Sequence, residues 1–434
     1  MATLETLHDL QLIAAGAFGY RSGELSCESV PLSEIASEFC TPTYVYTQSG
    51  LVDTLQAFRA AAQRIDGKCL TCFAVKANGS PALLAIMAEQ GIGADVVSGG
   101  ELYLAEAAGI DPQRIVFSGV GKTKAEIEEA ISAGILALHV ESPAEMELVA
   151  KTARALKRRA PVAVRVNPDV HVSTHAGVAT GEKGHKFGVE ARVAQDMMRA
   201  AADSPWLRPI GLSAHIGSQI ASIDPFRQSA EKLGQLADLL TEDGIRLRYV
   251  DAGGGLAIDY GAGSGPEIAE WLATVSEPIV GRGYDLLVEP GRSIIGPAGI
   301  LLTRVLYMKE QSGRQIAVVD AGMNDLLRPA LYGAQHPIVP VNQRDTAEGQ
   351  AWTTYEIVGP VCESTDVLAT DLSLSELRTG DLLAVLQAGA YGYVMSSNYN
   401  GRGRPAEVLV EKDRFHCIRQ REHYDSLLLG CSLA

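Results

Sequence analysis

The sequence has no apolar run close to the roughly 20 residues that a membrane-spanning helix needs. Its first ten residues lack the charged and then apolar layout of a signal peptide, because Glu5, His8 and Asp9 interrupt them. Basic residues are also in short supply, since 37 Lys and Arg residues stand against 52 Asp and Glu residues, for a formal net charge of −15. This balance argues against nucleic acid or an anionic membrane as the main partner. We therefore expect a cytoplasmic protein.

Cysteine is scarce and scattered along the chain. There are seven, an odd number, so a disulfide framework is not expected. Cys69 and Cys72 form a single C-x-x-C pair, which invites a redox or zinc interpretation. No second pair accompanies it, and the segment has the composition of a strand, on which these two side chains would point to opposite faces. A strand is the favoured interpretation.

The length of 434 residues suggests two domains, one of them large. From about residue 44 to residue 292, short β-rich runs alternate with amphipathic helical stretches, several of which begin with a Ser-Pro start signal, as at Ser80 and Ser142. Eight such units in about 250 residues fit a closed (β/α)8 barrel of the TIM type. The eight runs are Thr71–Val75, Ala94–Val97, Ile115–Phe117, Ala137–Val140, Val162–Val166, Gly211–His215, Tyr249–Asp251 and Leu286–Val288.

A doubly wound open sheet is the alternative, because it has the same alternation. The barrel is favoured by the polar residues that follow the ends of different runs, since all such ends converge on one face of a barrel. After residue 297 the texture changes to strands and turns with few long helical stretches, which predicts an all-β second domain. We therefore expect an N-terminal segment at 1–43 that packs with the β domain, an α/β barrel at 44–292 and the C-terminal β domain at 293–434.

Lys76 lies at the exit of the first predicted barrel strand, within Cys72–Asn78. A lysine beside an apolar strand is costly unless its charge is used or suppressed, and burial that lowers its pKa makes it a nucleophile toward aldehydes. The alternative is a lysine at a strand end whose amine reaches solvent.

Two glycine-containing turns follow the seventh and eighth predicted strands. They are Gly253–Gly255 and the segment Glu289–Arg292. Successive glycines let backbone N–H groups approach an anion, and barrels commonly bind phosphate with the loops after these two strands. A tight turn without a ligand would explain the glycines equally well.

The histidines leave several interpretations open. His215, at the end of the sixth strand, could stack on a flat ring, bind a metal or pack in the core. A metal is disfavoured there because no His, Asp or Glu stands beside it at ligand spacing. His171, His175 and His185 lie in a Gly-rich stretch, residues 167–188, which is more typical of a mobile loop over a site than of a metal centre.

Taken together, the motifs resemble the decarboxylases of the alanine-racemase-like (type III) pyridoxal-phosphate fold, and most closely those that act on diaminopimelate. The resemblance runs from about Pro42 to the C-terminus, with small departures at Ala257 and Thr365, where glycine is usual. It rests on the segments Ala74–Asn78, Asp95–Glu101, His215–Gln219, Gly253–Gly255, Glu289–Arg292, Met323–Tyr332, Gly359–Ser364 and Gly389–Gly392.

The resemblance implies pyridoxal 5′-phosphate as the cofactor, bound covalently by Lys76. Glu289 would face the pyridine nitrogen and strengthen the ring as an electron sink, whereas a racemase of this fold generally offers an arginine there. His215 would stack on the ring and Arg165 would contact its hydroxyl side. The other cofactor-binding residues implied are Asp95, Ser218, Gly254, Gly255, Gly291, Arg292 and Tyr391.

The resemblance also implies the substrate contacts. Arg292 and Arg328 suit the distal carboxylate of a dicarboxylic substrate, and Glu363 suits its distal ammonium. Tyr332 and Tyr391 complete the implied set. Cys362 matches the proton donor of the family, in which the Cys-Glu segment enters the site of the neighbouring subunit, so a homodimer is implied. The stretch from Ser173 to Gly188 matches the active-site lid of the family.

The expected reaction is decarboxylation of meso-2,6-diaminopimelate to L-lysine and CO2, the final step of lysine biosynthesis. A sister enzyme acting on D-lysine, D-ornithine, carboxynorspermidine or a siderophore or antibiotic intermediate is the alternative. A non-catalytic pyridoxal-phosphate carrier lacks the β domain that supplies Cys362 and Glu363, so the sequence speaks against it. A metal-dependent barrel hydrolase is the least favoured reading.

Overall fold

The computed structural model describes residues 16–172, 186–261, 263, 265–343 and 352–432. These residues form two compact units. The barrel unit comprises Leu55–Ile258 and Ser264–Ser293, and the β unit comprises the described residues up to Thr54 together with Asp259–Gly263 and those from Ile294 onward.

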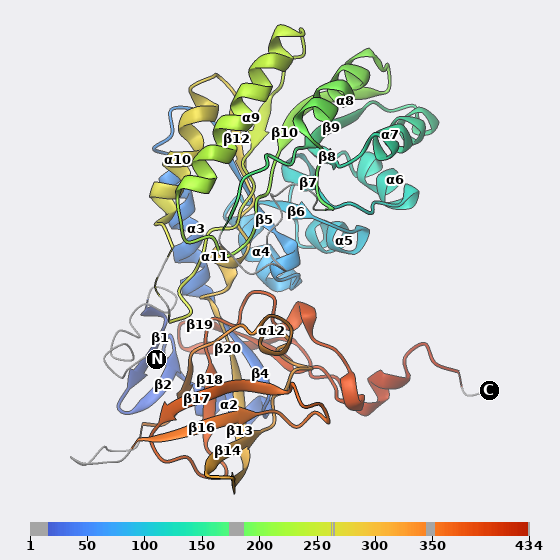
Figure 1. Ribbon diagram of the computed structural model, residues 1–434. Helices are drawn as coiled ribbons and strands as arrows, with labels where there is room; N and C mark the ends of the chain where they lie inside the picture. Colours follow the sequence, from blue (N-terminus) through green and yellow to red (C-terminus); the bar gives the residue numbers. More distant parts are fainter. Residues whose placement is uncertain (1–15, 173–185, 262, 264, 344–351, 433–434) are drawn as a thin grey trace. The chain divides into compact units, whose positions relative to one another are not determined.

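The barrel unit is built on a closed barrel of eight parallel strands, which confirms the expected fold class (Figure 1). The strands close in the order β10-β11-β12-β5-β6-β7-β8-β9, so β5 pairs with both β12 and β6. All eight predicted runs are strands, three of them with the predicted bounds. The strands are β5 (Cys69–Ala74), β6 (Gly93–Val96), β7 (Ile115–Phe117), β8 (Ala137–Val140), β9 (Ala160–Arg165), β10 (Leu207–Ser213), β11 (Tyr249–Asp251) and β12 (Asp285–Val288).

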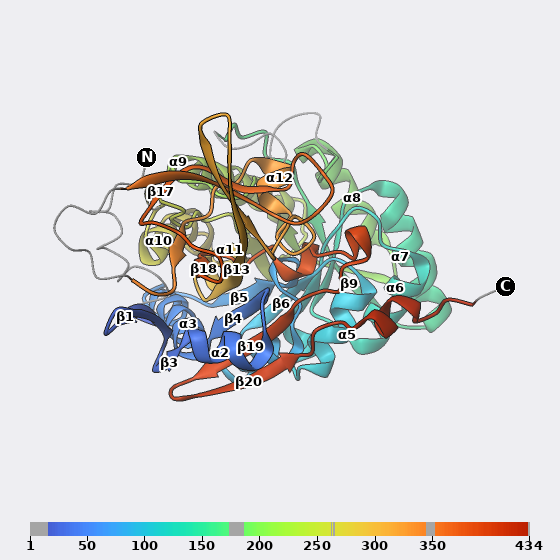
Figure 2. The same ribbon diagram turned by 90° about the horizontal axis from the view of Figure 1, so that it is seen from below.

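Helices surround the barrel strands, and Figure 2 shows α5 to α8 following one another along one side. The long helices are α3 (Gln48–Ala62), α4 (Pro81–Glu89), α5 (Gly99–Ala107), α6 (Lys124–Ala133), α7 (Pro143–Leu156), α8 (Ala191–Asp203), α9 (Asp224–Glu242) and α10 (Ile268–Val280). The short pieces are η3 (Val75–Ala77), η4 (Pro112–Arg114) and α11 (Arg292–Ile295).

Local sequence signals start several of these helices. The Ser142 hydroxyl accepts the N–H of Glu145 at 3.1 Å, and Pro143 occupies the first turn of α7, as expected. At α4 the expectation is half right, since Pro81 stands in the first turn but the Ser80 side chain makes no capping bond. There the Ser80 N–H is instead accepted by the Asn78 side chain at 3.0 Å.

A fully buried tryptophan joins three helices of the barrel unit. The Trp271 ring of α10 packs edge-on against Phe226 of α9 at 5.7 Å and against Phe58 of α3 at 6.3 Å, measured between ring centroids. Aromatic side chains bury large apolar areas in such edge-to-face pairs. This cluster fixes the helices that precede β5 and flank β11 and β12.

The β unit contains one large sheet and one small one, which confirms the expected all-β second domain. The path of the large sheet is β17-β16-β14-β13-β4-β19-β20, with β18 paired to β13 and to β15; β1, β2 and β3 form the small sheet. The strands are β1 (Phe18–Arg21), β2 (Glu24–Cys27), β3 (Val30–Pro31), β4 (Thr43–Thr47), β13 (Gly299–Gln311), β14 (Arg314–Val319), β15 (Ile338–Pro340), β16 (Thr353–Val358), β17 (Val367–Leu374), β18 (Leu382–Val385), β19 (Ala406–Glu411) and β20 (Arg414–Arg419).

Short helical segments connect the strands of the β unit. They are α2 (Leu32–Phe39), α12 (Arg328–Tyr332), η5 (Tyr393–Met395), η6 (Tyr399–Gly401) and η7 (Tyr424–Leu428). The core of this unit draws on both ends of the chain, because Phe18, Leu25 and Ile35 share one buried cluster with Ile300 and Val408.

The barrel domain was expected to start at residue 44, but strand β4 lies in the β unit. It lies between β13, to which it is antiparallel, and β19, to which it is parallel, so residues 43–47 belong to the sheet of the β unit. All five of its residues are buried. A fully buried run has the same composition in either kind of sheet, so the sequence could not assign it. In the part of the chain described, no helix is both long and apolar enough to cross a bilayer.

Candidate active site

Lys76 lies at the exit of the first barrel strand, as expected, in the single turn η3 that directly follows β5. Its Nζ donates a hydrogen bond to Oδ2 of Asp95, on β6, at 2.7 Å. The Asp95 side chain is fully buried, whereas that of Lys76 is 32% exposed. Burial by itself would raise the pKa of Asp95, but the Lys76 ammonium and its hydrogen bond hold that pKa below the usual value. The amine is therefore held at the barrel mouth and remains reachable.

Glu289 follows β12 and belongs to a buried acidic cluster. Its carboxylate accepts a hydrogen bond from the Ser118 hydroxyl at 3.5 Å. Burial raises its pKa well above the usual range, and the charges of Asp251 and Asp95 raise it further, while Lys76 lowers it. Burial also raises the pKa of Asp251 to about 7. Two buried carboxyl groups in contact do not both ionise readily, so near neutral pH Glu289 and Asp251 together hold a proton.

His139, on β8, lies between these two acids. Its Nδ1 lies 3.8 Å from Asp251 and 3.7 Å from Glu289, and its Nε2 hydrogen-bonds the Tyr249 hydroxyl at 2.8 Å. Burial lowers the pKa of His139 to about 3, so the imidazole is neutral near pH 7 and these contacts are not ion pairs. The three groups also have the spacing of a metal site, with candidate ligand atoms within 4.8 Å of one another. Neither His139 nor Asp251 was assigned a role from the sequence.

The glycine turn after β11 is required by close backbone packing. Gly253 and Gly255 have φ angles of 73° and 108°, in the region that favours glycine. A Cβ on Gly254 would collide with the carbonyl oxygen of Glu289, and one on Gly253 with that of Ala214. The glycines therefore allow the loops after β10, β11 and β12 to approach one another, which is the alternative explanation that the sequence left open beside phosphate binding.

His215 and the turn are joined directly. The N–H of Gly254 donates to Nδ1 of His215 at 3.1 Å, so Nδ1 is the acceptor and Nε2 carries the proton of the neutral ring. Burial lowers the pKa of His215 to about 3, and the charges of Lys76 and Arg165 lower it further. A neutral, fixed imidazole at this position fits stacking on a flat ring better than ion pairing.

Arg292 and Ser218 lie together beside this turn. The Ser218 hydroxyl accepts from Nη2 of Arg292 at 3.0 Å and from Nε at 3.3 Å. Arg292 begins α11 and is 7% exposed. Gly291, just before it, has no room for a side chain, since a Cβ would press on the methyl groups of Ala74 and Ala77. A guanidinium and a hydroxyl on neighbouring loops are groups that bind phosphate or carboxylate oxygens.

Arg165, at the end of β9, is positioned by a residue that the sequence did not single out. Glu141, just after β8, accepts a hydrogen bond from Nη1 of Arg165 at 3.1 Å. Glu141 also accepts the N–H of Gly119 at 3.0 Å and that of Gly188 at 2.9 Å. The guanidinium lies over the Phe187 ring, 4.8 Å from its centroid. The position of Glu141 just past a barrel strand was the available signal.

The remaining expected site residues belong to the β unit. Arg328 and Tyr332 lie one turn apart on α12, and Arg328 is 6% exposed. Cys362 and Glu363 are adjacent in the exposed loop between β16 and β17. The N–H of Cys362 donates to the Asn400 side chain at 2.7 Å. Tyr391 has a left-handed backbone conformation, with φ of 56°.

Some expected features can be placed only in part or not at all. Most of the expected lid, together with His175 and His185, falls outside the described residues. In the C-x-x-C pair, burial raises the pKa of Cys69 to about 12 and that of Cys72 well above the usual range. These thiols therefore lack the lowered pKa of a reactive pair.

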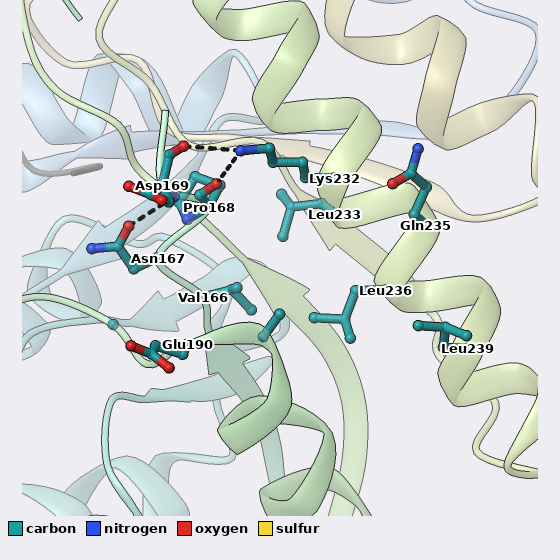
Figure 3. A pocket seen from close by; sticks show the side chains of 12 residues that line it. Val166, Asn167, Pro168, Asp169, Glu190, Lys232, Leu233, Gln235, Leu236 and Leu239 are labelled. Carbon is teal, nitrogen blue, oxygen red and sulfur yellow. Dashed lines mark hydrogen bonds between the residues drawn. The ribbon is translucent and has the colours of Figure 1, made fainter. Parts of the chain in front are cut away.

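A separate hollow lies beside the loop after β9 (Figure 3). It has a volume of about 510 Å³ and includes Val166, Leu236 and Leu239 in its lining. Nζ of Lys232 donates to the carbonyl oxygens of Pro168 at 2.8 Å and Asp169 at 2.9 Å. Its lining contains none of the residues expected to bind the cofactor or the substrate, but it includes Gly188, the last residue of the expected lid.

The residues of the barrel mouth fit pyridoxal phosphate. Lys76 supplies an amine for an aldehyde, and His215 supplies a flat neutral ring. Ser218 and Arg292 supply donors for phosphate oxygens. A protonated ring nitrogen beside Glu289 would provide the positive charge that this buried acidic cluster lacks, which is the strongest point of the fit.

Comparison with known proteins gives the same family. The family model for the pyridoxal-binding domain of pyridoxal-dependent decarboxylases matches residues 51–296. A diaminopimelate decarboxylase of Aquifex aeolicus is 45% identical over 94% of this chain and 96% of its own length, and one of Pseudomonas aeruginosa is 46% identical over 96% and 99%. The crystal structure of diaminopimelate decarboxylase from M. jannaschii with L-lysine superposes with a TM-score of 0.92 at 34% identity, covering 97% of this chain and 99% of that one. The chain therefore belongs to the pyridoxal-dependent decarboxylases and, among them, to the family of the diaminopimelate decarboxylases.

Proposed function

We propose that the protein uses pyridoxal phosphate to decarboxylate meso-2,6-diaminopimelate, releasing CO2 and L-lysine. The observation that carries the proposal is the arrangement of Lys76, Asp95 and Glu289 at the same end of the barrel. The relatives named above, which are similar over nearly the whole chain, support diaminopimelate as the substrate.

The cofactor, when bound, supplies an electron sink for the pair of electrons left on carbon as CO2 departs. The residues of the chain hold the cofactor and favour the form of its ring that accepts this electron pair. Lys76 offers the amine for the aldehyde carbon, and Asp95 orients that amine. Glu289 offers a carboxylate to the ring nitrogen, and an anion there favours the protonated ring that accepts electrons best. His215 would cover one face of the bound ring, and Arg165 would contact its hydroxyl side.

For the substrate, we assign the distal carboxylate to Arg328 and Arg292, and we add Tyr332 to the substrate-binding residues. A guanidinium forms two parallel hydrogen bonds to a carboxylate, which gives both affinity and orientation. Glu363 receives the distal ammonium group. Ser218, Gly254, Gly255, Gly291 and Tyr391 complete the set of phosphate contacts.

Cys362 donates the proton that replaces the lost carboxyl group. The C–C bond breaks, CO2 leaves without the bonding electron pair, and the thiol proton is transferred to the carbon that keeps this pair. We further propose that Cys362 and Glu363 act in the site of a partner subunit, so that the active enzyme is a homodimer. The exposure of both side chains supports this, since neither is buried within its own chain. A cytoplasmic location stays a prediction from the sequence.

The assay that tests the proposal uses the purified holoenzyme with four separate substrates. Meso-2,6-diaminopimelate is compared with D-lysine, D-ornithine and carboxynorspermidine, and CO2 release and the amine product are measured. We expect the highest kcat/KM for diaminopimelate and L-lysine as its product. A higher kcat/KM for one of the other three would assign the protein to a sister activity.

A further inference from the structure

Arg328 contacts the partly buried Tyr260 and the buried His336, and all three lie in the β unit. Nη1 of Arg328 donates to the Tyr260 hydroxyl at 2.9 Å and lies 2.7 Å from Nε2 of His336. The guanidinium also stacks over the Tyr260 ring, 4.9 Å from its centroid, and the rings of Tyr260 and His336 meet edge-on at 5.0 Å. His336 is 5% exposed and Arg328 is 6% exposed.

The hydrogen bonds of His336 assign its protonation. Nδ1 lies 2.9 Å from the carbonyl oxygen of Leu386, and a carbonyl oxygen only accepts, so Nδ1 carries a proton. The guanidinium of Arg328 has donors and no acceptor, so the contact at Nε2 requires a lone pair there. Both bonds form only when the imidazole is neutral and protonated at Nδ1. The Leu386 carbonyl therefore presents Nε2 to Arg328 as an acceptor.

This arrangement fixes the direction of the Arg328 side chain before any ligand arrives. The imidazole and the phenol hold Nη1 from two sides, and the phenol ring limits rotation of the guanidinium plane. A planar fork binds a carboxylate through two bonds only when its plane is correctly oriented. An arginine that must become ordered on binding loses affinity, because immobilising a long side chain costs conformational entropy.

We propose that His336 is a positioning residue for substrate specificity, which orients Arg328 to recognise the distal carboxylate of an amino-acid substrate. The inference rests on the proposed function only in taking the distal carboxylate as the ligand of Arg328. Tyr260 acts with His336, through its hydroxyl and its ring face. Neither residue touches the reacting carbon, so both act on binding and not on the bond-breaking step.

Two substitutions each keep one of the two hydrogen bonds of His336 and remove the other. In His336→Gln the side-chain oxygen reaches the position of Nε2 and still accepts from Arg328. In His336→Asn the amide nitrogen reaches the position of Nδ1 and still donates to the Leu386 carbonyl, but the side chain no longer offers Arg328 an acceptor at the position of Nε2. The Asn variant is thus the test, and the Gln variant is its matched control.

The measurement is inhibition of the holoenzyme by two ligands that differ in one group. L-Lysine keeps the distal carboxylate, and 1,5-diaminopentane lacks it. In His336→Asn we expect the inhibition constant of L-lysine to rise about fivefold to tenfold, which corresponds to about 1–1.4 kcal/mol, while that of 1,5-diaminopentane stays unchanged. We also expect a higher KM for diaminopimelate with kcat within about twofold. His336→Gln should restore most of the lysine affinity.

A third variant controls for a folding defect at His336, and a fourth tests the assumption that Arg328 binds the distal carboxylate. Tyr260→Phe keeps the ring and removes only the hydroxyl contact, and we expect a smaller rise, about twofold to threefold, for L-lysine alone. If neither His336→Asn nor Tyr260→Phe alters the ratio of the two inhibition constants, the positioning role is overturned. Arg328→Gln shows whether Arg328 binds the distal carboxylate. An unchanged ratio of the two inhibition constants in that variant would mean that it does not.

Discussion

Glu289 is held in the barrel with more acidic neighbours than basic ones. Burial and the nearby Asp251 and Asp95 raise its pKa, and the only cation that lowers it among its main influences is Lys76. His139 does not offset this charge, since its own pKa is lowered to about 3. A group with a protonated ring nitrogen would bind here in part because it brings the missing positive charge. The acidity of the cluster is thus suited to the cofactor and would be a cost without it.

The Glu289→Gln substitution tests whether the negative charge of Glu289 is needed for the cofactor to act. A carboxamide keeps the size of the side chain but carries no negative charge to favour a protonated ring nitrogen. We expect kcat to fall by about a hundredfold or more, with the cofactor content, measured by its absorbance, close to that of the unsubstituted enzyme. Ser118→Ala is the control, because it removes the neutral hydroxyl that contacts Glu289 at 3.5 Å and His139 at 3.3 Å but leaves the charge of Glu289 in place, and we expect a loss below about tenfold. Equal losses in the two variants would count against a role for the charge.

Glu101 provides a pH-dependent test of stability. Burial raises its pKa to about 7, the charge of Asp95 raises it further, and the N–H of Val97 donates to it at 2.8 Å. A folded-state pKa above the unfolded value means that folding favours the protonated acid, so the contribution to stability is complete below about pH 4.5 and is lost as the pH rises through about 7. Glu101→Gln stays neutral at every pH and retains an acceptor for Val97. Thermal unfolding should show no difference at pH 4.5 and an advantage of about 1–3 kcal/mol for the variant at pH 8.

Among the secondary-structure elements, the barrel strands were predictable because each is a short apolar run with a helical pattern on either side. In the β unit the sequence predicted strands and turns but not the order in which the strands pair. Strands β4 and β15 pair with strands far away in the chain, so local sequence could not show their partners, whereas β17 and β20 pair with β16 and β19, the strands just before them. The capping bonds at helix starts were predicted less reliably, because a neighbouring side chain can replace the expected one. Ser80, for example, makes no side-chain capping bond to α4.

Glu126 connects the starts of two helices. Together with Thr123 it forms the capping box of α6, in which its Oε2 accepts the Thr123 N–H at 2.9 Å, and its Oε1 accepts the Gly99 N–H at the start of α5 at 2.8 Å. Replacing it leaves two backbone donors without this acceptor, so we expect Glu126→Ala to lower the free energy of unfolding by about 1–2 kcal/mol. Glu128→Ala is the matched control on the same helix, since Glu128 makes only an exposed ion pair with Lys124. Urea unfolding of both variants measures the difference, and a similar change in each would contradict the bridging role.

For the whole molecule, the sequence located much of the barrel mouth because parallel strands end on one face. That rule pointed to Lys76, Asp95, Arg165, His215 and Glu289, and the structure has each of them at a strand end. The same rule applies to Ser118 and Glu141, which directly follow β7 and β8, but nothing in a single sequence shows which of these polar side chains contacts which other residue. The substrate-side residues of the β unit were named only through the family resemblance, since a β domain has no comparable geometric rule.

At the scale of the assembly, we predict that two copies of the chain contribute to each active site. If Cys362 acts in the partner's site, each active site combines the Lys76 of one subunit with the Cys362 of the other. Lys76→Ala and Cys362→Ala homodimers would then each be nearly inactive, for different reasons. A random mixture would contain about one half heterodimers, each with one doubly substituted site and one intact site, as expected for a symmetric dimer. Unfolding and refolding the two variants together should therefore restore about a quarter of the wild-type activity.

This recovery distinguishes shared sites from sites built within one chain. If each chain supplied both its own Lys76 and its own Cys362, every site in the mixture would lack one of them, and activity would stay at the level of the separate variants. A mixture of Lys76→Ala with Lys76→Ala,Cys362→Ala serves as the control, because no pairing of these chains can assemble an intact site. Sedimentation of the mixture checks that dimers have formed. Recovery with the first mixture and not with the second would then indicate an active site made by two chains, as proposed for the exposed Cys362–Glu363 loop.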